Sequence, residues 1–350
     1  LSSGGFAAPA ALSVAAAVRV RRAVRLYNQL SSGGFASPAT LSVTAAVRVL
    51  RTGPLFDDPA STVDDAIDDL VVVNGSSGQV TAVCNGSTGA AATSAVLPTV
   101  VMGARDAVVV RVNASAHAVA YISPLQGNLY LAETIGPFAP RCTSLAFDPN
   151  TLAIGAVSPT AITGGRFLTR GTAVEDIVVI TTTGDAFLFA NAPAQAGGFQ
   201  LVAAPIATGL TGALSATAGD FNGDGRLDVV VGTATGAHFI ENTDGTATGF
   251  VASAISGSPV DVVSTSASDI NLDGRDDLIT ASSSADSVDW WERVGTGWLR
   301  HSLVSDFNGA RAAVAGDVDS DGDLDVIAAA FQAATVTWWT TEIVSNATFV

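Results

Sequence analysis

Three short acidic segments carry the residues best suited to chemistry in this sequence. They read DFNGDGRLD, DINLDGRDD and DVDSDGDLD at residues 220–228, 269–277 and 317–325, and share the pattern D-x-[DN]-x-D-G-x-x-D. Hard cations such as Ca²⁺ take about six to eight oxygen ligands in a flexible shell. A curled loop can supply oxygens from side chains at positions 1, 3, 5 and 9 and from the carbonyl at position 7. The glycine at position 6 permits the sharp turn. The pattern therefore predicts a calcium loop in each segment.

We name these segments the first, second and third loops, in chain order. The predicted ligands of the first loop are Asp220, Asn222, Asp224, the carbonyl of Arg226, and Asp228. Those of the second loop are Asp269, Asn271, Asp273, the carbonyl of Arg275, and Asp277. Those of the third loop are Asp317, Asp319, Asp321, the carbonyl of Asp323, and Asp325. An EF-hand would have Glu at position 12, where these loops have Val231, Thr280 and Ala328.

The spacing of the loops decides between calcium binding and a plain Asp/Asn/Gly turn. One copy would fit an ordinary turn between strands equally well. Three copies that start 49 and 48 residues apart favour a repeated metal site. No redox or acid–base group stands beside the carboxylates in the sequence, so we expect the calcium to be structural.

The loops and the strands expected after them resemble FG-GAP/VCBS repeats, the blades of the integrin alpha-subunit type of β-propeller. Aromatic pairs agree with this resemblance, because Trp290-Trp291 and Trp338-Trp339 each begin 13 residues after the closing Asp of their loop. Phe239-Ile240 fill that place after the first loop. The resemblance covers residues 200–350, is weaker before them, and is absent from the first fifty residues. It implies a propeller fold and calcium binding, and it does not imply one activity.

A degenerate repeat extends the pattern toward the N-terminus. An Asp precedes a β-branched run at Asp69, Asp106 and Asp176, and residues 151–157 resemble such a run without the Asp. With the three loops this makes seven candidate units, and repeats of this length with four short strands each are typical of propellers. We predict an all-β fold with a single propeller over residues 52–350. Seven blades are favoured, six are the alternative, and only the last three should bind metal.

The first 51 residues differ from the rest in pattern and charge. Residues 1–20 and 30–49 are identical at 17 of 20 positions. Apolar and polar residues alternate in the second copy, which predicts a strand with one apolar face, with a helix as the alternative. Residues 1–56 contain six Arg and no acidic residue, whereas the remainder has a net charge of −22. We therefore predict an extended basic arm over residues 1–51 that serves assembly.

Cysteines and glycosylation sequons bear on the compartment. Cys84 and Cys142 could form one disulfide in an oxidising compartment, and two buried thiols are the alternative. The N-x-[ST] sequons stand at Asn74, Asn85, Asn113 and Asn346. Together with loops suited to millimolar external calcium, they predict a secreted or cell-surface glycoprotein.

Composition argues against several classes of function. The net charge of −16 disfavours a nucleic-acid partner, and the longest uncharged stretches contain Gly, Asn, Ser, Thr and Pro, so no membrane span is expected. The chain has three histidines, His117, His238 and His301, and lacks the common nucleophile, zinc and phosphate-loop motifs. We therefore expect no enzymatic activity.

Two functions remain. A strand-like arm can add to the open sheet edge of a neighbour, and head-to-tail contacts of this kind generate open filaments when the rotation between subunits does not close. We favour a structural protein that forms a homopolymer, either a fibril or a surface layer. The alternative is an extracellular adhesion module that binds glycans or other proteins without polymerising.

Overall fold

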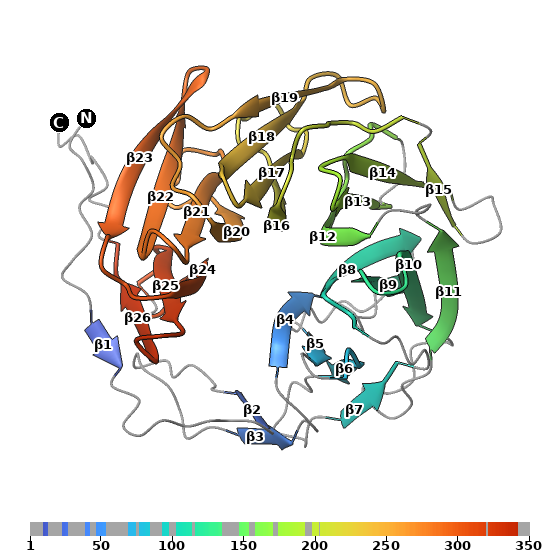
Figure 1. Ribbon diagram of the computed structural model, residues 1–350, viewed down its shortest axis with the longest axis horizontal. Helices are drawn as coiled ribbons and strands as arrows, with labels where there is room; N and C mark the ends of the chain where they lie inside the picture. Colours follow the sequence, from blue (N-terminus) through green and yellow to red (C-terminus); the bar gives the residue numbers. More distant parts are fainter. Residues whose placement is uncertain are drawn as a thin grey trace, which may run out of the picture.

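The computed structural model shows a ring of β-sheets, and its described part is built from 26 β-strands (Figure 1). The structure describes residues 10–12, 23–26, 39–42, 47–53, 69–74, 77–84, 93–97, 103–113, 116–134, 147–153, 158–170, 174–192, 198–202, 204–319 and 321–341.

Six four-stranded antiparallel sheets form the blades among the described residues. Blade 1 contains β4 (Val47–Gly53), β5 (Asp69–Asn74), β6 (Val80–Cys84) and β7 (Thr93–Val96). Blade 2 contains β8 (Asp106–Asn113), β9 (Ala116–Ser123), β10 (Asn128–Thr134) and β11 (Phe147–Ala153). Blade 3 contains β12 (Pro159–Gly165), β13 (Asp176–Thr181), β14 (Ala186–Asn191) and β15 (Phe199–Leu201).

The last three blades follow the first half of the ring. Blade 4 contains β16 (Ala213–Gly219), β17 (Asp228–Thr233), β18 (Gly236–Asn242) and β19 (Phe250–Ala254). Blade 5 contains β20 (Val262–Ser268), β21 (Asp277–Ser282), β22 (Ser287–Val294) and β23 (Gly297–Val304). Blade 6 contains β24 (Ala310–Gly316), β25 (Asp325–Ala330), β26 (Thr335–Trp339) and, as its fourth strand, β1 (Ala10–Leu12). The first strand of each blade lies nearest the centre of the ring (Figure 1).

The second strand of each blade explains why the β-branched runs fold as they do. In blades 3, 4 and 5 these strands read DIVVIT, DVVVGT and DLITAS, and every residue in them is buried. A strand covered on both faces is expected to be a near-continuous apolar run. The runs that follow Asp176, Asp228 and Asp277 are therefore strands whose two faces are both covered by neighbouring parts of the ring.

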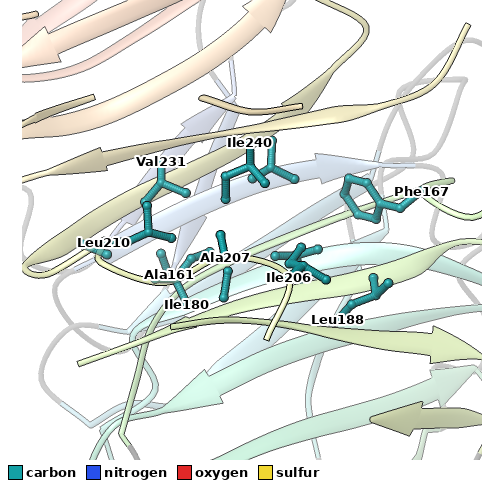
Figure 2. Close-up of a cluster of buried hydrophobic side chains, with 13 residues drawn as sticks. Ala161, Phe167, Ile180, Leu188, Ile206, Ala207, Leu210, Val231 and Ile240 are labelled. Carbon is teal, nitrogen blue, oxygen red and sulfur yellow. The ribbon is translucent and has the colours of Figure 1, made fainter. Parts of the chain in front are cut away.

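The hydrophobic core is divided among the junctions between blades. Figure 2 shows the junction of blades 3 and 4, where Ile180 and Leu188 of blade 3 lie near Val231 and Ile240 of blade 4. Ile206, Ala207 and Leu210, in the connection between the two blades, fill the same cluster. Similar clusters join the other consecutive blades from blade 1 to blade 6.

The structure gives six blades, which is the second of the two predicted counts. Two of the seven predicted units fall in one blade, since Asp106 begins the first strand of blade 2 and residues 151–153 end its fourth strand. Only residues 114 and 115 separate β8 from β9, so blade 2 has no room for a nine-residue loop at that point. The short connection explains why the spacing of the predicted repeat units is irregular around blade 2.

The N-terminal segment contributes to two blades. The predicted boundary between residues 51 and 52 lies inside β4, which pairs with β5 from Val47↔Asn74 to Gly53↔Asp69. Strand β1 pairs with β26 of the same chain, in the register Ala10↔Trp338 and Leu12↔Val336. The expectation of an arm outside the propeller thus differs from the structure at β1 and β4. Strand β1 pairs with the edge of β26, whose backbone groups need a partner, and β4 is the first strand of blade 1.

A separate hairpin lies between these two contributions. Strands β2 (Ala23–Leu26) and β3 (Ala39–Ser42) form a two-stranded antiparallel sheet. Within the duplication, Ala39 to Leu41 of β3 are the counterparts of Ala10 to Leu12 of β1. The two copies therefore take different pairings. In the described part of the chain no helix has the length and apolar character needed to cross a membrane.

The buried His117 on β9 makes the stability of the propeller depend on pH. Its side chain is 7 % exposed, and burial, with Arg111 nearby, lowers its pKa from 6.5 to about 4. The unfolded chain binds a proton at this residue near pH 6.5, so the stability contributed by the neutral ring is fully present above pH 6.5. It is lost as the pH falls toward 4, by up to roughly 3 kcal/mol.

We expect His117→Gln to flatten the pH dependence of stability between pH 6.5 and 4. Urea unfolding in EDTA, at several pH values, measures the free energy of unfolding of both proteins. The difference between the two curves isolates His117, because the carboxylates titrate in both. Parallel curves would contradict the assignment.

Candidate metal centre

The three predicted loops occupy equivalent places in blades 4, 5 and 6. Each connects the first strand of its blade to the second, so all three lie on the same face of the ring. The glycines at position 6 have φ angles of 81° (Gly225), 84° (Gly274) and 95° (Gly322), in the left-handed region that favours glycine. The sequence pattern therefore predicted both the position of these loops and their turn.

The first Asp of each loop holds this turn closed. Its Oδ2 atom accepts a hydrogen bond from the glycine N–H at position 6, over 2.9 Å from Gly225 to Asp220 and from Gly274 to Asp269. The distance from Gly322 to Asp317 is 3.2 Å. The side chain at position 5 closes a smaller turn, since Asp224, Asp273 and Asp321 each accept the N–H of the residue at position 7. Hydrogen bonds within each loop thus bring the ligand side chains together.

The third loop brings its carboxylates closest together. Oxygen atoms of Asp317, Asp319 and Asp325 all lie within 4.8 Å of one another. Such a group, beside the turn that presents the carbonyl of Asp323, suits a hard cation. This Asp triad could hold a metal ion.

The closing Asp of each loop is buried, and in the first and third loops it has a second role. Asp228 and Asp325 are 0 % exposed and Asp277 is 1 % exposed. Oδ1 of Asp228 accepts the N–H of Asn242 at 2.7 Å, and Oδ1 of Asp325 accepts that of Thr341 at 3.0 Å. These carboxylates therefore fasten the end of the third strand to the second strand in addition to facing the loop.

Burial disfavours the ionised form of these closing carboxylates, because they are removed from water. Desolvation raises the pKa of Asp228 and of Asp277 to about 7. The Oδ2 atom of Asp228 is buried and has no hydrogen-bond partner among the described residues. A buried, unpartnered carboxylate oxygen is costly, and a cation in the first loop would supply its missing partner. The residues of the first loop therefore fit a bound calcium ion.

Arginine distinguishes the first two loops from the third. The guanidinium group of Arg226 pairs with Asp224, and that of Arg275 pairs with Asp273. The hydrogen bond from Arg275 lowers the pKa of Asp273. The third loop has Asp323 at the corresponding position. The carboxylate at position 5 is thus already neutralised in the first two loops, so the third loop should attract a cation more strongly.

Two carboxylates near the loops were missed by the sequence analysis. Glu241 accepts a hydrogen bond from the Asn222 side chain at 3.3 Å, and its charge helps to raise the pKa of Asp228. Glu292 occupies the same place in blade 5. Both residues directly follow the aromatic pair or its counterpart, so that position was the available signal.

Blade 3 has the same buried carboxylate without a metal loop. Asp176 is 1 % exposed, and it accepts the backbone N–H of Asn191 at 2.9 Å and that of Leu168 at 3.1 Å. The guanidinium group of Arg170 pairs with it. An arginine side chain therefore supplies here the positive charge that a cation would supply in the later blades. Residues 64–68, the acidic run before β5, lie outside the described residues.

The remaining predicted sites are only partly described. Asn74 is 8 % exposed and its Oδ1 atom accepts the N–H of Ser77 at 3.0 Å, so a glycan there would have to displace buried contacts. Asn113 ends β8 and is half-buried. Asn85, Asn346 and Cys142 lie outside the described residues, so the pairing with Cys84 stays a prediction.

Comparison with known proteins agrees with the repeats read from the structure. The FG-GAP-like repeat model matches residues 173–231 and 269–328, and the FG-GAP repeat model matches residues 212–252. The chain therefore contains FG-GAP repeats, the repeats of integrin alpha-type β-propellers. No curated protein matches it. Among solved structures, a crystal structure of BBS1N in complex with ARL6DN, soaked with mercury, is 13 % identical. That similarity covers 85 % of this chain and 93 % of that chain, with a TM-score of 0.42.

The two roles of the third-loop carboxylates can be separated by substitution. Asp319 is exposed, whereas Asp325 accepts two backbone hydrogen bonds inside the blade, from Val318 and Thr341. We expect Asp319→Asn to reduce the rise in unfolding temperature produced by calcium and to leave the value in EDTA nearly unchanged. Asp325→Asn should cost about 1–3 kcal/mol in EDTA, because one buried N–H donor loses its acceptor, and more in calcium, because Asp325 is also a predicted ligand.

Thermal unfolding in excess calcium and in excess EDTA measures both effects. Calcium should stabilise the parent protein, since an ion that binds only the folded state shifts the equilibrium by mass action. An equal loss for Asp319→Asn in both buffers would contradict the separation. An unfolding temperature of the parent that does not respond to chelation would contradict calcium binding in all three loops.

Proposed function

We propose that this chain is an extracellular, non-catalytic structural propeller that binds three structural calcium ions and assembles with copies of itself through its N-terminal strands. The observation that carries the assembly is the position of β1. A segment far away in the chain completes blade 6, and a near-identical second copy of that segment takes another pairing. The calcium role rests on the three loops, of which the third has the most closely gathered carboxylates.

The calcium ions would be held by the loop residues already described. The first loop would use Asp220, Asn222, Asp224, Asp228 and the Arg226 carbonyl, with corresponding sets in the other two loops. When bound, calcium supplies positive charge beside buried carboxylates, and the loop then holds the first strand against the second. Calcium sites on extracellular modules typically have dissociation constants of roughly 10⁻⁴–10⁻³ M, and the proposed location outside the cell predicts an affinity in that range for these loops.

Packing accounts for the histidines better than catalysis does. The ring of His301 stacks on that of Trp290, with 4.1 Å between their centroids. His117 is buried, and burial lowers the pKa of His238. These surroundings support a structural role for the three residues.

The edge of β26 is the proposed point of contact between subunits. Strand β1 pairs with it through backbone groups in an antiparallel register, and backbone pairing depends little on which chain supplies the strand. A strand donated to the next subunit would repeat head to tail and produce an open filament. Attraction between the six Arg of residues 1–56 and the acidic remainder supports association, although salt screens it within about 8–10 Å.

Cysteine pairs at matched positions test whether the strand comes from a second chain. Leu12 is the register partner of Val336 in the pairing of β1 with β26. Residues directly opposite each other on two antiparallel strands lie close enough for a disulfide. We expect a mixture of Leu12→Cys chains and Val336→Cys chains to form covalent heterodimers under mild oxidation, visible on a non-reducing gel. Leu41→Cys, at the corresponding position of the second copy, should also cross-link to Val336→Cys.

The control places a cysteine on the surface away from this edge. Leu125→Cys is suitable, since Leu125 is 77 % exposed in the turn between β9 and β10 of blade 2, and it should not cross-link to Leu12→Cys chains above background. Negative-stain microscopy of the native protein should show filaments or a layer. If only the Leu12→Cys, Val336→Cys double variant cross-links, within one chain, and the native protein stays monomeric, the strand serves its own propeller. The adhesion or binding module would then take the place of the assembly.

A further inference from the structure

Asp276 is an acidic residue of the second loop that belongs to none of the predicted ligand sets. It stands at position 8, between the carbonyl ligand Arg275 and the closing ligand Asp277. Leucine occupies this position in the other two loops, as Leu227 and Leu324. A half-buried carboxylate at a position otherwise filled by an apolar side chain calls for a physical explanation.

The contacts of Asp276 lie in the neighbouring blade. Its backbone N–H donates to the carbonyl oxygen of Asp220 at 3.0 Å. Its Oδ2 atom accepts the backbone N–H of Asp220 at 2.8 Å. Both hydrogen bonds therefore hold the backbone of Asp220, which is the first ligand residue of the first loop.

Close packing reinforces this connection between the two loops. A Cβ atom added at Gly219, just before Asp220, would lie 3.0 Å from the Oδ2 atom of Asp276. One added at Gly223, inside the first loop, would lie 2.8 Å from the Cγ atom of Arg275. Glycine at both positions lets the second loop lie directly against the first.

We propose that Asp276 is a positioning residue that couples calcium binding in the first and second loops. An ion in the second loop would fix Arg275 and Asp277, and with them the residue between. Asp276 would then hold Asp220 in place, so that the first loop loses less conformational freedom when it binds its own ion. The coupling is reciprocal, because each ion must favour the other by the same factor. This inference rests on the proposed calcium binding in these loops.

The third loop provides the internal comparison. Its position 8 is Leu324, which has no carboxylate to accept a backbone N–H from the second loop. The coupling through position 8 therefore joins the first and second loops, and the third loop should bind its ion independently of it.

A double-mutant cycle on the full chain tests the coupling, with Ca²⁺ as the titrant in isothermal titration calorimetry. Asp319→Ala, present throughout, removes the third site from the signal. Asp269→Ala then disables the second loop, and the dissociation constant of the first loop is compared with and without it. We expect disabling the second loop to weaken the first by at least about fivefold. In the Asp276→Leu background the same change should weaken the first loop much less, because only the backbone hydrogen bond to the carbonyl oxygen of Asp220 then remains.

The conservative variant Asp276→Asn keeps a side-chain acceptor and should retain much of the coupling. Thermal unfolding of each variant in EDTA shows whether it still folds. If Asp276→Leu does not fold, the comparison is made with Asp276→Asn instead. If both loops bind calcium but Asp269→Ala does not change the dissociation constant of the first loop, the coupling is overturned and the calcium role remains. Equal coupling with and without Asp276 would overturn its assignment to this residue. Absence of calcium binding in the parent chain would overturn the calcium role and the coupling with it.

Discussion

A buried carboxylate at the start of the second strand is the constraint on which blades 3 to 6 depend. Asp176, Asp228, Asp277 and Asp325 are each at most 1 % exposed. A carboxylate in such a place must be neutralised or matched by donors and positive charge. Backbone N–H groups from the loop and from the end of the third strand supply part of this, and Arg170 supplies the charge in blade 3. In the last three blades a bound cation, as we propose, would supply that charge, and metal binding would then be linked to the stability of those blades.

Neighbouring blades are joined by polar contacts as well as by the apolar junctions. The Ser215 hydroxyl donates to the carbonyl of Val262 at 3.3 Å, and that of Ser266 donates to the carbonyl of Ala313 at 3.0 Å. Both bonds run from the first strand of one blade to that of the next. Together with the contact of Asp276 on Asp220, they tie the loop-bearing blades into one unit. A change at one loop therefore has a direct physical route to its neighbour.

The last blade of the ring is completed by pairing at a sheet edge. Blade 6 is completed by β1, a strand that lies more than three hundred residues away from β26 in the sequence. An exposed edge strand presents unpaired backbone N–H and C=O groups that can pair with another strand. The duplicated segment gives this chain two candidate strands of nearly the same sequence. In this structure the first copy takes that edge through β1 of the same chain, and the second copy pairs with β2.

The sequence by itself determined the features that depend on local residue order. The Asp and Gly spacing predicted the three loops and their turns, the β-branched runs predicted strands, and the repeats matched FG-GAP models as expected. Tertiary structure decided what depends on contacts between distant residues. The placement of two predicted units in blade 2, the pairing of β1 with β26, and the contact of Asp276 on a neighbouring loop all join segments that no local pattern connects. The sequence marked Glu241 only by its place after the aromatic-pair position, and its proximity to the first loop arises when the third strand of the blade folds back beside that loop.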